Sequence, residues 1–310
     1  IILTQTAANT WEGRFIVSGL NATQPTWSMG LKTIVDENAW ELGANEVITV
    51  SQSDDAKSVV IYPYYQTTKG QQTTIKNFYS PQLNNSRDVW LYIPPAMVEN
   101  TLRYEKNVLI MQDGQNLAPL WNVPTTLDDL ISSSKMQSVF IIGPYNTGGN
   151  RINEYTYCVD PSYGGGEGEL YLDFMEQTLV PAIKAQYQIL TAKENLGTLG
   201  SSLGGLISCY AGVTRPHVYS KLGCMSSSFW WDYRNFSKWV VPKLTKEHVQ
   251  TQTYYLDSGD SGDSDDGRPD TSQVASQFVQ AGFELGSNFY WYLQRGGEHN
   301  EFYWSKRFHH

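Results

Sequence analysis

The sequence predicts an α/β protein in which a doubly wound sheet over residues 75–310 follows a small β-rich, sandwich-like domain over residues 1–74. From about residue 75 onward, short apolar runs alternate with segments of helical spacing, which is typical of strands covered by helices on both faces. Before that point, turn residues separate the apolar runs and no helical period lies between them.

In the N-terminal segment we expect short strands at residues 14–18, 46–50 and 58–62. Clusters of Gly, Asn, Asp and Ser between them favour turns. Three tryptophans could bind a sugar ring, although tryptophan in a small β-domain more often packs in the core; these are Trp11, Trp27 and Trp40.

The expected sheet begins with three apolar runs that each end at turn-forming residues. Val89–Ile93 is followed by two prolines, Val108–Met111 leads into an Asp-Gly turn, and residues 139–142 are followed by Gly-Pro. A helix is expected over residues 169–187, in which Pro181 should kink or restart the helix. Its core-facing stripe consists of Leu172, Met175, Leu179 and Ile183.

A glycine- and serine-rich stretch comes next. Gly200-Ser201-Ser202-Leu203-Gly204 fits the pattern G-x-S-x-G, in which a sharp strand-to-helix turn exposes a serine hydroxyl. Small residues are needed there, because bulk two positions before or after the serine would collide with the neighbouring strand and helix. Ser202 is therefore the candidate nucleophile. The alternative is a Gly/Ser-rich turn without a catalytic role, because so short a motif also arises by chance.

Further strands are expected at residues 222–225, 254–257 and 289–293, with a helix over residues 271–283 between the last two. This order of strand, elbow, helix and further strands is what the α/β-hydrolase fold requires after its nucleophile.

A serine hydroxyl is a poor nucleophile at neutral pH, so it needs a base to take its proton and an acid to orient that base. In α/β-hydrolases the chain order is Ser, then acid, then His. His299 is the predicted base, because it lies in a glycine-rich turn just past the last strand. We interpret His217 and His248 as surface residues, since one follows a proline and the other lies in a charged helix.

The orienting acid is expected after the penultimate strand, where the sequence from Asp257 to Gly267 is unusually acidic. Two other interpretations of this loop are a solvated acidic surface and a weak calcium site, because Asp263, Asp265 and Gly267 resemble half of an EF-type loop without its distal glutamate. The spacing alone leaves open which aspartate faces His299.

An acyl-transfer enzyme also needs hydrogen-bond donors for the tetrahedral oxyanion. One is expected to be the backbone N–H of Leu203, directly after the nucleophile. For the other, the loop after residues 108–111 offers a glycine-opened backbone at Asp113-Gly114-Gln115-Asn116, and we expect the N–H of Gln115.

Six motifs, in this order along the chain, resemble the Putative esterase family, which groups esterase D-like hydrolases with enterochelin and feruloyl esterases. They lie at residues 87–95, 111–116, 150–156, 200–205, 226–231 and 296–301. The resemblance covers about residues 75–308. It implies an α/β-hydrolase with a serine nucleophile matching Ser202 and a base matching His299.

The acid does not transfer directly from this resemblance. Relatives often place it about three positions after the glycine that ends the strand, where this chain has Gly262, so an insertion must be assumed. Counting back from His299 favours Asp266, which we predict, whereas counting forward from the strand favours the alternatives Asp263 or Asp260. Some relatives of the siderophore-esterase type work with a Ser/His pair alone, which would make the acid dispensable.

Ligands of open α/β sheets bind at the carboxyl ends of the strands. Aromatic residues in the loops at that edge are predicted to ring the substrate pocket: Trp121, Tyr145, Tyr157, Phe229 and Trp230. For each one taken singly, core packing is an equally good interpretation. An aromatic pocket mouth suits an aryl or sugar-borne ester.

The composition excludes several classes of partner. With 22 Lys and Arg against 31 Asp and Glu, the formal net charge is −9, and no basic run occurs, which argues against binding to nucleic acid or an anionic membrane surface. No stretch approaches 18 consecutive apolar residues, so no membrane span is expected. The 3 cysteines permit one disulfide at most and lack metal-ligand spacing. A start at Ile1 indicates a processed or trimmed chain. Sequons at Asn21, Asn84 and Asn235, together with an Asn/Ser/Thr-rich, lysine-poor sequence, favour a secreted protein.

The sequence thus predicts a serine carboxylic ester hydrolase that needs no cofactor and acts on short-chain, aryl or carbohydrate-linked esters of acetyl or feruloyl type. A siderophore-type esterase, an acyltransferase or a peptidase would use the same residues. An inactive hydrolase-fold protein that binds carbohydrate is the alternative from another class, and the Ser202 and His299 pair argues against it.

Overall fold

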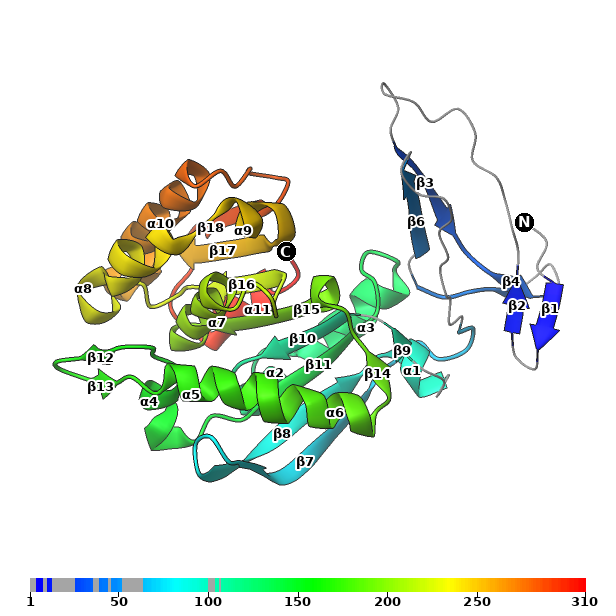
Figure 1. The fold of residues 1–310 in the computed structure, drawn as a ribbon, viewed down its shortest axis with the longest axis horizontal. Coiled ribbons are helices and arrows are strands. Elements are labelled where there is room, and N and C mark those ends of the chain that lie inside the picture. Colours follow the sequence, from blue (N-terminus) through cyan, green and yellow to red (C-terminus); the bar gives the residue numbers. More distant parts are fainter. Residues whose placement is uncertain are drawn as a thin grey trace.

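The computed structural model describes residues 4–7, 10–12, 26–35, 39–43, 46–51, 64–99, 104–105 and 107–310. Its centre is an eight-stranded sheet with the order β18-β17-β16-β15-β10-β11-β8-β7 (Figure 1). Within it, β8 runs antiparallel to both of its neighbours, and all other neighbouring strands are parallel. The strands are β7 (Gln71–Ser80), β8 (Asn85–Ile93), β10 (Asn107–Met111), β11 (Val139–Pro144), β15 (Leu196–Ser201), β16 (Lys221–Met225), β17 (Thr253–Gly259) and β18 (Phe289–Gln294).

Helices pack on both faces of the sheet (Figure 1). The cluster on one face includes side chains from α5, α6, α7 and α10, and the cluster on the other includes side chains from α3 and α11. The helices are α1 (Pro95–Glu99), α2 (Gly114–Leu117), α3 (Val123–Ser132), α4 (Arg151–Glu154), α5 (Gly168–Asp173), α6 (Val180–Gln186), α7 (Leu203–Thr214), α8 (Trp231–Asn235), α9 (Lys246–Thr251), α10 (Arg268–Gln280) and α11 (Glu301–Arg307).

The strands show why the sheet is covered on both sides. In β8, Val89 and Leu91 belong to one hydrophobic cluster, and Trp90 and Tyr92 belong to the other. Successive side chains of a strand point to opposite faces, so a continuous apolar run supplies a core on each side. The predicted doubly wound α/β sheet is therefore confirmed.

Pro181 interrupts the expected helix, as the sequence predicts. The expected helix over residues 169–187 forms as α5, a π-helical turn η2 (Phe174–Leu179) and α6, in which Pro181 is the second residue. Proline lacks the N–H for an i→i−4 bond and its ring displaces the preceding turn, so the helix widens there. The predicted stripe still faces the core, because Leu172, Met175, Leu179 and Ile183 are all fully buried.

Strand β7 was not among the predicted strands. It lies at the edge of the sheet, most of its side chains reach solvent, and its register shifts between Ile75 and Phe78. Such an edge strand lacks the apolar alternation by which strands are recognised. The boundary expected at residue 74 falls inside β7, and the division of the chain into two domains stays a prediction.

The remaining elements are short. Antiparallel pairs form between β1 (Thr4–Ala7) and β2 (Thr10–Glu12), β3 (Thr26–Leu31) and β6 (Glu46–Ser51), and β4 (Ile34–Val35) and β5 (Ala39–Trp40). Others are β9 (Tyr104–Glu105), β12 (Val159–Asp160), β13 (Gly164–Gly165), β14 (Ile189–Leu190), η1 (Gly148–Asn150), η3 (Lys193–Asn195), η4 (Phe236–Val240), η5 (Val241–Lys243) and η6 (Asp263–Gly267). The strands expected at residues 14–18 and 58–62, the sequon at Asn21, and the side chains of Trp11, Trp27 and Trp40 lie outside the described part of the structure.

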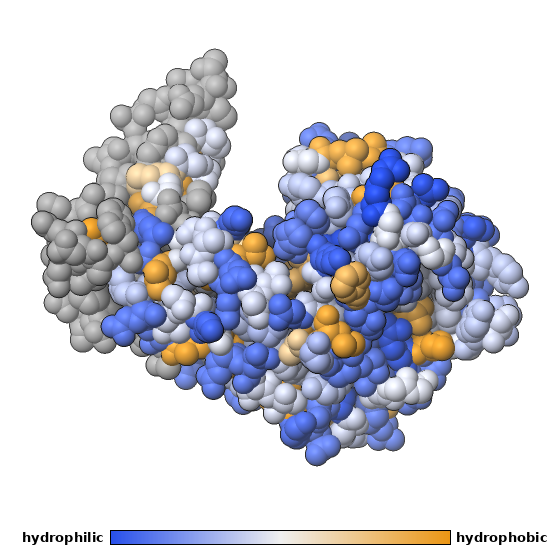
Figure 2. All heavy atoms as spheres, turned by 180° about the vertical axis from the view of Figure 1, so that it is seen from behind, coloured by the Kyte–Doolittle hydropathy of each residue, from blue (hydrophilic) through white to orange (hydrophobic). Residues whose placement is uncertain are grey.

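Within the described ranges, none of the helices has both the length and the apolar character for a membrane crossing. Figure 2 shows one face of the molecule, on which hydrophobic side chains form separate small patches in a mostly hydrophilic surface. Scattered patches of this kind are normal for a folded protein in water.

Candidate active site

Ser202 lies in a sharp turn between β15 and α7, with φ 59° and ψ −125°. A positive φ is costly for a serine and persists only where the surroundings impose it. The glycines of the pattern allow the turn to close: a Cβ on Gly200 would lie 2.6 Å from backbone atoms of Gly204, and a Cβ on Gly204 would lie 3.0 Å from Cβ of Gln112. The G-x-S-x-G pattern therefore has a steric cause in this structure.

Three loops at the carboxyl edge of the sheet bring Ser202, His299 and Asp266 together. The Nε2 atom of His299 lies 2.9 Å from Ser202 Oγ, and its Nδ1 atom lies 2.6 Å from Asp266 Oδ1. Ser202 follows β15, Asp266 lies in η6 after β17, and His299 lies between β18 and α11. The three side chains form one continuous chain of hydrogen bonds.

The two other predicted acids lie elsewhere. Asp263 is exposed, and Asp260 accepts a hydrogen bond from the backbone N–H of Gly296 at 2.6 Å. His217 is exposed as expected, but the interpretation of His248 as a surface residue is wrong. His248 is buried because its ring caps the start of α9 through Thr245 and lies 3.0 Å from the Val213 carbonyl oxygen.

Asp266 is fully buried, and its second carboxylate oxygen is held by groups from the turn after β16, from β17 and from α11. Oδ2 accepts hydrogen bonds from Ser226 Oγ at 2.7 Å, from the backbone N–H of Gly259, and from Arg307 Nη1 at 3.2 Å. Burial alone would raise the pKa of Asp266, but the hydrogen bonds from His299, Ser226 and Gly259 and the Arg307 charge together hold it below its usual range. Asp266 is therefore ionised at neutral pH.

Sequence reasoning missed Arg307 and Asp257. Arg307 lies near the end of α11 with a side chain that is 0% exposed, and its Nε atom lies 3.4 Å from Asp257 Oδ2. Asp257 is also fully buried, and burial raises its pKa to about 6. One arginine is thus shared between two carboxylates. The acidic run after residue 257 was visible in the sequence, but nothing in it indicated a cationic partner from the last helix.

The two backbone N–H groups predicted to face the oxyanion belong to the first turns of two helices. Leu203 is the first residue of α7 and Gln115 the second residue of α2, so neither N–H has an acceptor within its own helix. The α2 loop packs tightly on β11, because a Cβ on Gly114 would lie 1.9 Å from the Gly143 carbonyl oxygen. Helix N-termini of this kind attract negative charge.

The side chain of Asp113, directly before α2, holds this loop through an ion pair and a hydrogen bond. Its carboxylate forms a two-pronged ion pair with Arg151, with both N–O distances at 2.8 Å, and accepts a further bond from Asn146 at 2.7 Å. Asp113 itself has a left-handed backbone conformation at φ 59°. The ion pair therefore helps to hold a strained turn directly before Gly114 and Gln115.

The five predicted pocket aromatics differ in exposure. Trp121 and Phe229 are 4% and 1% exposed, so core packing accounts for them and they have little surface to offer a ligand. Tyr157 stacks on Tyr210 with ring centroids 4.0 Å apart, and Tyr145 is half-buried. Trp230 is 43% exposed, and its loop also holds Ser228, whose hydroxyl lies 3.4 Å from that of Ser202.

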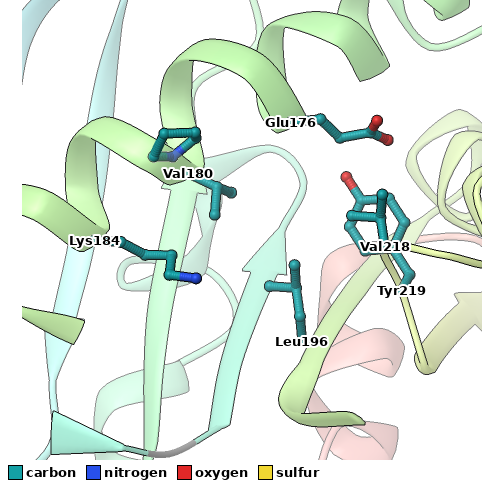
Figure 3. Close-up of a pocket in the computed structure, with 7 residues that line it drawn as sticks. Glu176, Val180, Lys184, Leu196, Val218 and Tyr219 are labelled. Carbon is teal, nitrogen blue, oxygen red and sulfur yellow. The ribbon is translucent and has the colours of Figure 1, made fainter. Parts of the chain in front are cut away.

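A cavity of about 400 Å³ lies elsewhere, at the amino end of β15 (Figure 3). It is lined in part by Glu176, Lys184, Leu196 and Tyr219, and Leu196 is the first residue of the strand that Ser202 follows. This cavity is therefore separate from the site around Ser202. Among the described residues, no group of three or more His, Cys, Asp or Glu could hold a metal ion. The cysteines Cys158, Cys209 and Cys224 are free.

The chain matches proteins of known sequence over most of its length. The model of the Putative esterase family matches residues 80–310. Uncharacterized protein YbbA of Bacillus subtilis is 24% identical over 250 residues, which cover 76% of this chain and 94% of that protein. Iron(III) enterobactin esterase of Escherichia coli O6:H1 is 22% identical over 208 residues, which cover 64% of this chain and 46% of that protein. The chain thus spans less than half of the enterobactin esterase it matches.

Solved structures share the fold. A ferulic acid esterase aligns with a TM-score of 0.63 at 18% identity, covering 78% of this chain and 95% of that one. The enterobactin esterase of Shigella flexneri, solved in the presence of enterobactin, aligns with a TM-score of 0.61 at 18% identity, covering 77% of this chain and 57% of that one. With most of its length matched by the family model and its fold shared with solved esterases, the chain belongs to the Putative esterase family of α/β-hydrolases and is a carboxylic ester hydrolase.

Proposed function

We propose that the chain hydrolyses esters with Ser202 as the nucleophile, His299 as the general base and Asp266 as the acid that orients His299. The observation that carries this proposal is the chain of hydrogen bonds from Ser202 Oγ through both nitrogens of His299 to Asp266 Oδ1, with distances of 2.9 Å and 2.6 Å. An ionised, buried Asp266 accepts a hydrogen bond from Nδ1–H of His299, which leaves Nε2 unprotonated and able to accept the proton of Ser202.

In the first half of the reaction, Nε2 of His299 takes the Ser202 proton while Oγ forms a bond to the ester carbonyl carbon. The carbonyl oxygen becomes an oxyanion, which accepts hydrogen bonds from the N–H groups of Leu203 and Gln115. Each donor lowers the free energy of the transition state by about 3 to 4 kcal/mol. Collapse of this intermediate breaks the ester C–O bond, and the leaving alcohol takes the proton from His299.

In the second half, water attacks the acyl-enzyme. Nε2 of His299 takes one water proton as the hydroxyl oxygen bonds to the acyl carbon, and the bond to Ser202 Oγ then breaks as that oxygen regains its proton. The products are the free carboxylic acid and the original enzyme, so each cycle consumes one ester and one water molecule and leaves the protein unchanged.

We further propose that the substrate carries an aryl or sugar group. Trp230 is 43% exposed and lies two residues after Ser228, whose hydroxyl is 3.4 Å from that of Ser202. The Trp230 ring contacts Tyr163, which is 59% exposed, with centroids 5.7 Å apart. Exposed aromatic faces favour planar aryl groups and the apolar faces of sugars. The name ferulic acid esterase on a protein of the same fold agrees with an aryl ester.

The substitution Ser202→Ala tests the mechanism with p-nitrophenyl acetate and butyrate. We expect kcat to fall by about 10⁴-fold or more, because the nucleophile is lost while the fold is kept. Ser276→Ala is the matched control, since Ser276 is an exposed serine on α10 away from the site. Wild-type turnover by Ser202→Ala would overturn the assignment.

The substrate class needs a second experiment. Feruloyl, acetyl-xylan, triscatecholate and short aliphatic esters should be compared by kcat/KM in the wild type and in Trp230→Ala. We expect the aryl or sugar-borne esters to lose several-fold more kcat/KM than the short aliphatic esters, since an aromatic contact contributes about 1 kcal/mol. An equal loss on all esters would contradict the aromatic contact.

A further inference from the structure

Arg307 is the buried cation nearest to the Asp266 carboxylate. Its side chain is 0% exposed, and Nη1 and Nη2 lie 3.2 Å and 3.3 Å from Asp266 Oδ2. Nη2 also donates to the hydroxyl of Ser226 at 2.5 Å, and that hydroxyl donates in turn to the same oxygen of Asp266. A buried charge with this many directed contacts is held in one orientation.

The contacts divide the two oxygens of Asp266 between two tasks. Oδ2 is occupied by Arg307, Ser226 and the backbone of Gly259, whereas the His299 ring contacts Oδ1 at 2.6 Å. A carboxylate fixed at one oxygen cannot rotate its other oxygen away from the imidazole. The last helix of the chain, α11, therefore reaches the loop that carries the orienting acid.

Only a few titratable or charged groups among the described residues face Asp266. The titratable or charged groups that face it are His299, Arg307 and Asp257, and Tyr255 donates a hydrogen bond to Asp257 at 3.0 Å. Arg307 is the permanent cation in this set, because an arginine keeps its proton at all ordinary pH values. Its removal would leave the buried carboxylates facing only each other, His299 and neutral donors.

We infer that Arg307 is a positioning residue, which keeps Asp266 ionised and aimed at His299 through contacts with Oδ2. This inference rests on the proposed function, because it assigns Arg307 a role in the reaction through Asp266. A purely structural role, in which Arg307 only docks α11 on the sheet, is the alternative that the test must separate.

The pH profile of kcat/KM separates these roles. Loss of a buried positive charge makes it easier to protonate the coupled Asp266 and His299 pair, whichever residue takes the proton. In Arg307→Gln the acid limb of the profile should therefore move up by about one pH unit or more, and in Arg307→Lys, which keeps the charge, by less than about half of that. A lower plateau with an unmoved limb in both variants would overturn the inference.

A second pair of variants keeps the test valid if Arg307→Gln does not fold. Asp257→Asn together with Arg307→Gln removes one buried charge of each sign, so the net charge of the cluster is unchanged. Compared with Asp257→Asn alone, this protein differs only at position 307, and its acid limb should again lie higher. Arg295→Gln, at a surface arginine with an 88% exposed side chain, is the control and should leave the limb unmoved.

Failure of the proposed mechanism is distinguishable from failure of this inference. The carbon-bound ring proton of His299 can be titrated by NMR in Ser202→Ala protein, with and without Arg307→Gln, where no turnover is needed. The titration midpoint should be higher in the Arg307→Gln protein, and equal midpoints would overturn the role of Arg307. Turnover retained by Ser202→Ala would overturn the nucleophile assignment alone.

Discussion

Two buried arginines in this molecule neutralise carboxylates in different ways. Arg87 forms a closed pair with Glu154, with its two terminal nitrogens 2.7 Å and 2.8 Å from the two carboxylate oxygens and both side chains 0% exposed. Arg307 instead lies between Asp257 and Asp266, and one oxygen of Asp266 is directed to His299. The closed pair uses all of its charge internally, whereas the shared arginine leaves negative charge for a third partner.

This difference separates stability from chemistry. The Arg87 and Glu154 pair joins β8 to α4 across 67 residues of sequence, and the arginine also lies over the rings of Tyr171 and Phe174. Nothing in that pair contacts Ser202 or His299 in the structure. We therefore expect substitutions in the closed pair to lower the free energy of unfolding, and substitutions in the shared cluster to change the reaction.

The largest effect is expected for Asp266→Asn. The amide cannot carry the negative charge that stabilises protonated His299, and it can hold the ring in the wrong tautomer, so kcat should fall by about 10⁴-fold. The measurement is the steady-state hydrolysis of p-nitrophenyl butyrate. Asp263→Asn in the same loop tests the alternative acid, and a larger loss there than in Asp266→Asn would reassign the acid.

The next largest effect is expected for Glu154→Gln, which breaks the closed pair. An uncompensated buried guanidinium should lower the free energy of unfolding by about 3 to 5 kcal/mol. Urea unfolding at pH 7 measures this loss, and kcat per folded molecule should stay within about twofold of the wild type. A loss of kcat comparable to that of Asp266→Asn, without unfolding, would remove the distinction between the two arginines.

Asp257, one of the two carboxylates that share Arg307, should make the free energy of unfolding depend on pH. Burial raises its pKa from 3.8 to about 6, so the folded state binds this proton more tightly than the unfolded state. The resulting stabilisation is full below the unfolded value and is lost as the pH rises through the folded value. The free energy of unfolding of the wild type, relative to Asp257→Asn, should therefore fall by about 2 to 3 kcal/mol between about pH 4 and about pH 7.

Asp266 should contribute in the opposite direction, because its pKa is lowered. Its stabilisation is present above the unfolded value and is lost as the pH falls through the folded one. Urea midpoints of wild type, Asp257→Asn and Asp266→Asn at several pH values separate the two slopes. Parallel curves for wild type and Asp257→Asn would show that Asp257 does not titrate abnormally.

The sequence was informative where local chemistry decides the structure. Strands such as β8 are apolar on both faces, and the turn at Ser202 needs small neighbours, so both leave a clear local pattern. The choice of Asp266 depended on an insertion whose turn has left-handed backbone angles at Ser264, Asp265 and Asp266. The spacing of the acidic loop did not indicate that geometry.

Arg307 could not be predicted for a different reason. It lies 41 residues from Asp266 in the last turn of α11, where a basic residue is ordinary because it interacts favourably with the helix C-terminus and solvent. Only the packing of α11 against β17 and η6 turns it inward, between two carboxylates. Long-range charge pairing of this kind leaves no local pattern in the sequence.

The smallest effect is expected for Asn85→Ala, which touches the closed pair at its edge. Asn85 accepts a bond from Arg87 at 2.8 Å and donates one to Glu154 at 2.9 Å, so it satisfies one atom of each partner. Because the ion pair itself remains, the free energy of unfolding should fall by only about 1 to 2 kcal/mol, with an unchanged pH profile of kcat/KM.

Ser226→Ala is the matching change beside Arg307, because it removes a hydroxyl that donates to Asp266. With that donor lost, the acid limb of the kcat/KM profile should move to higher pH. If both variants moved the limb, or neither did, the two arginines would not differ in the way that their contacts imply.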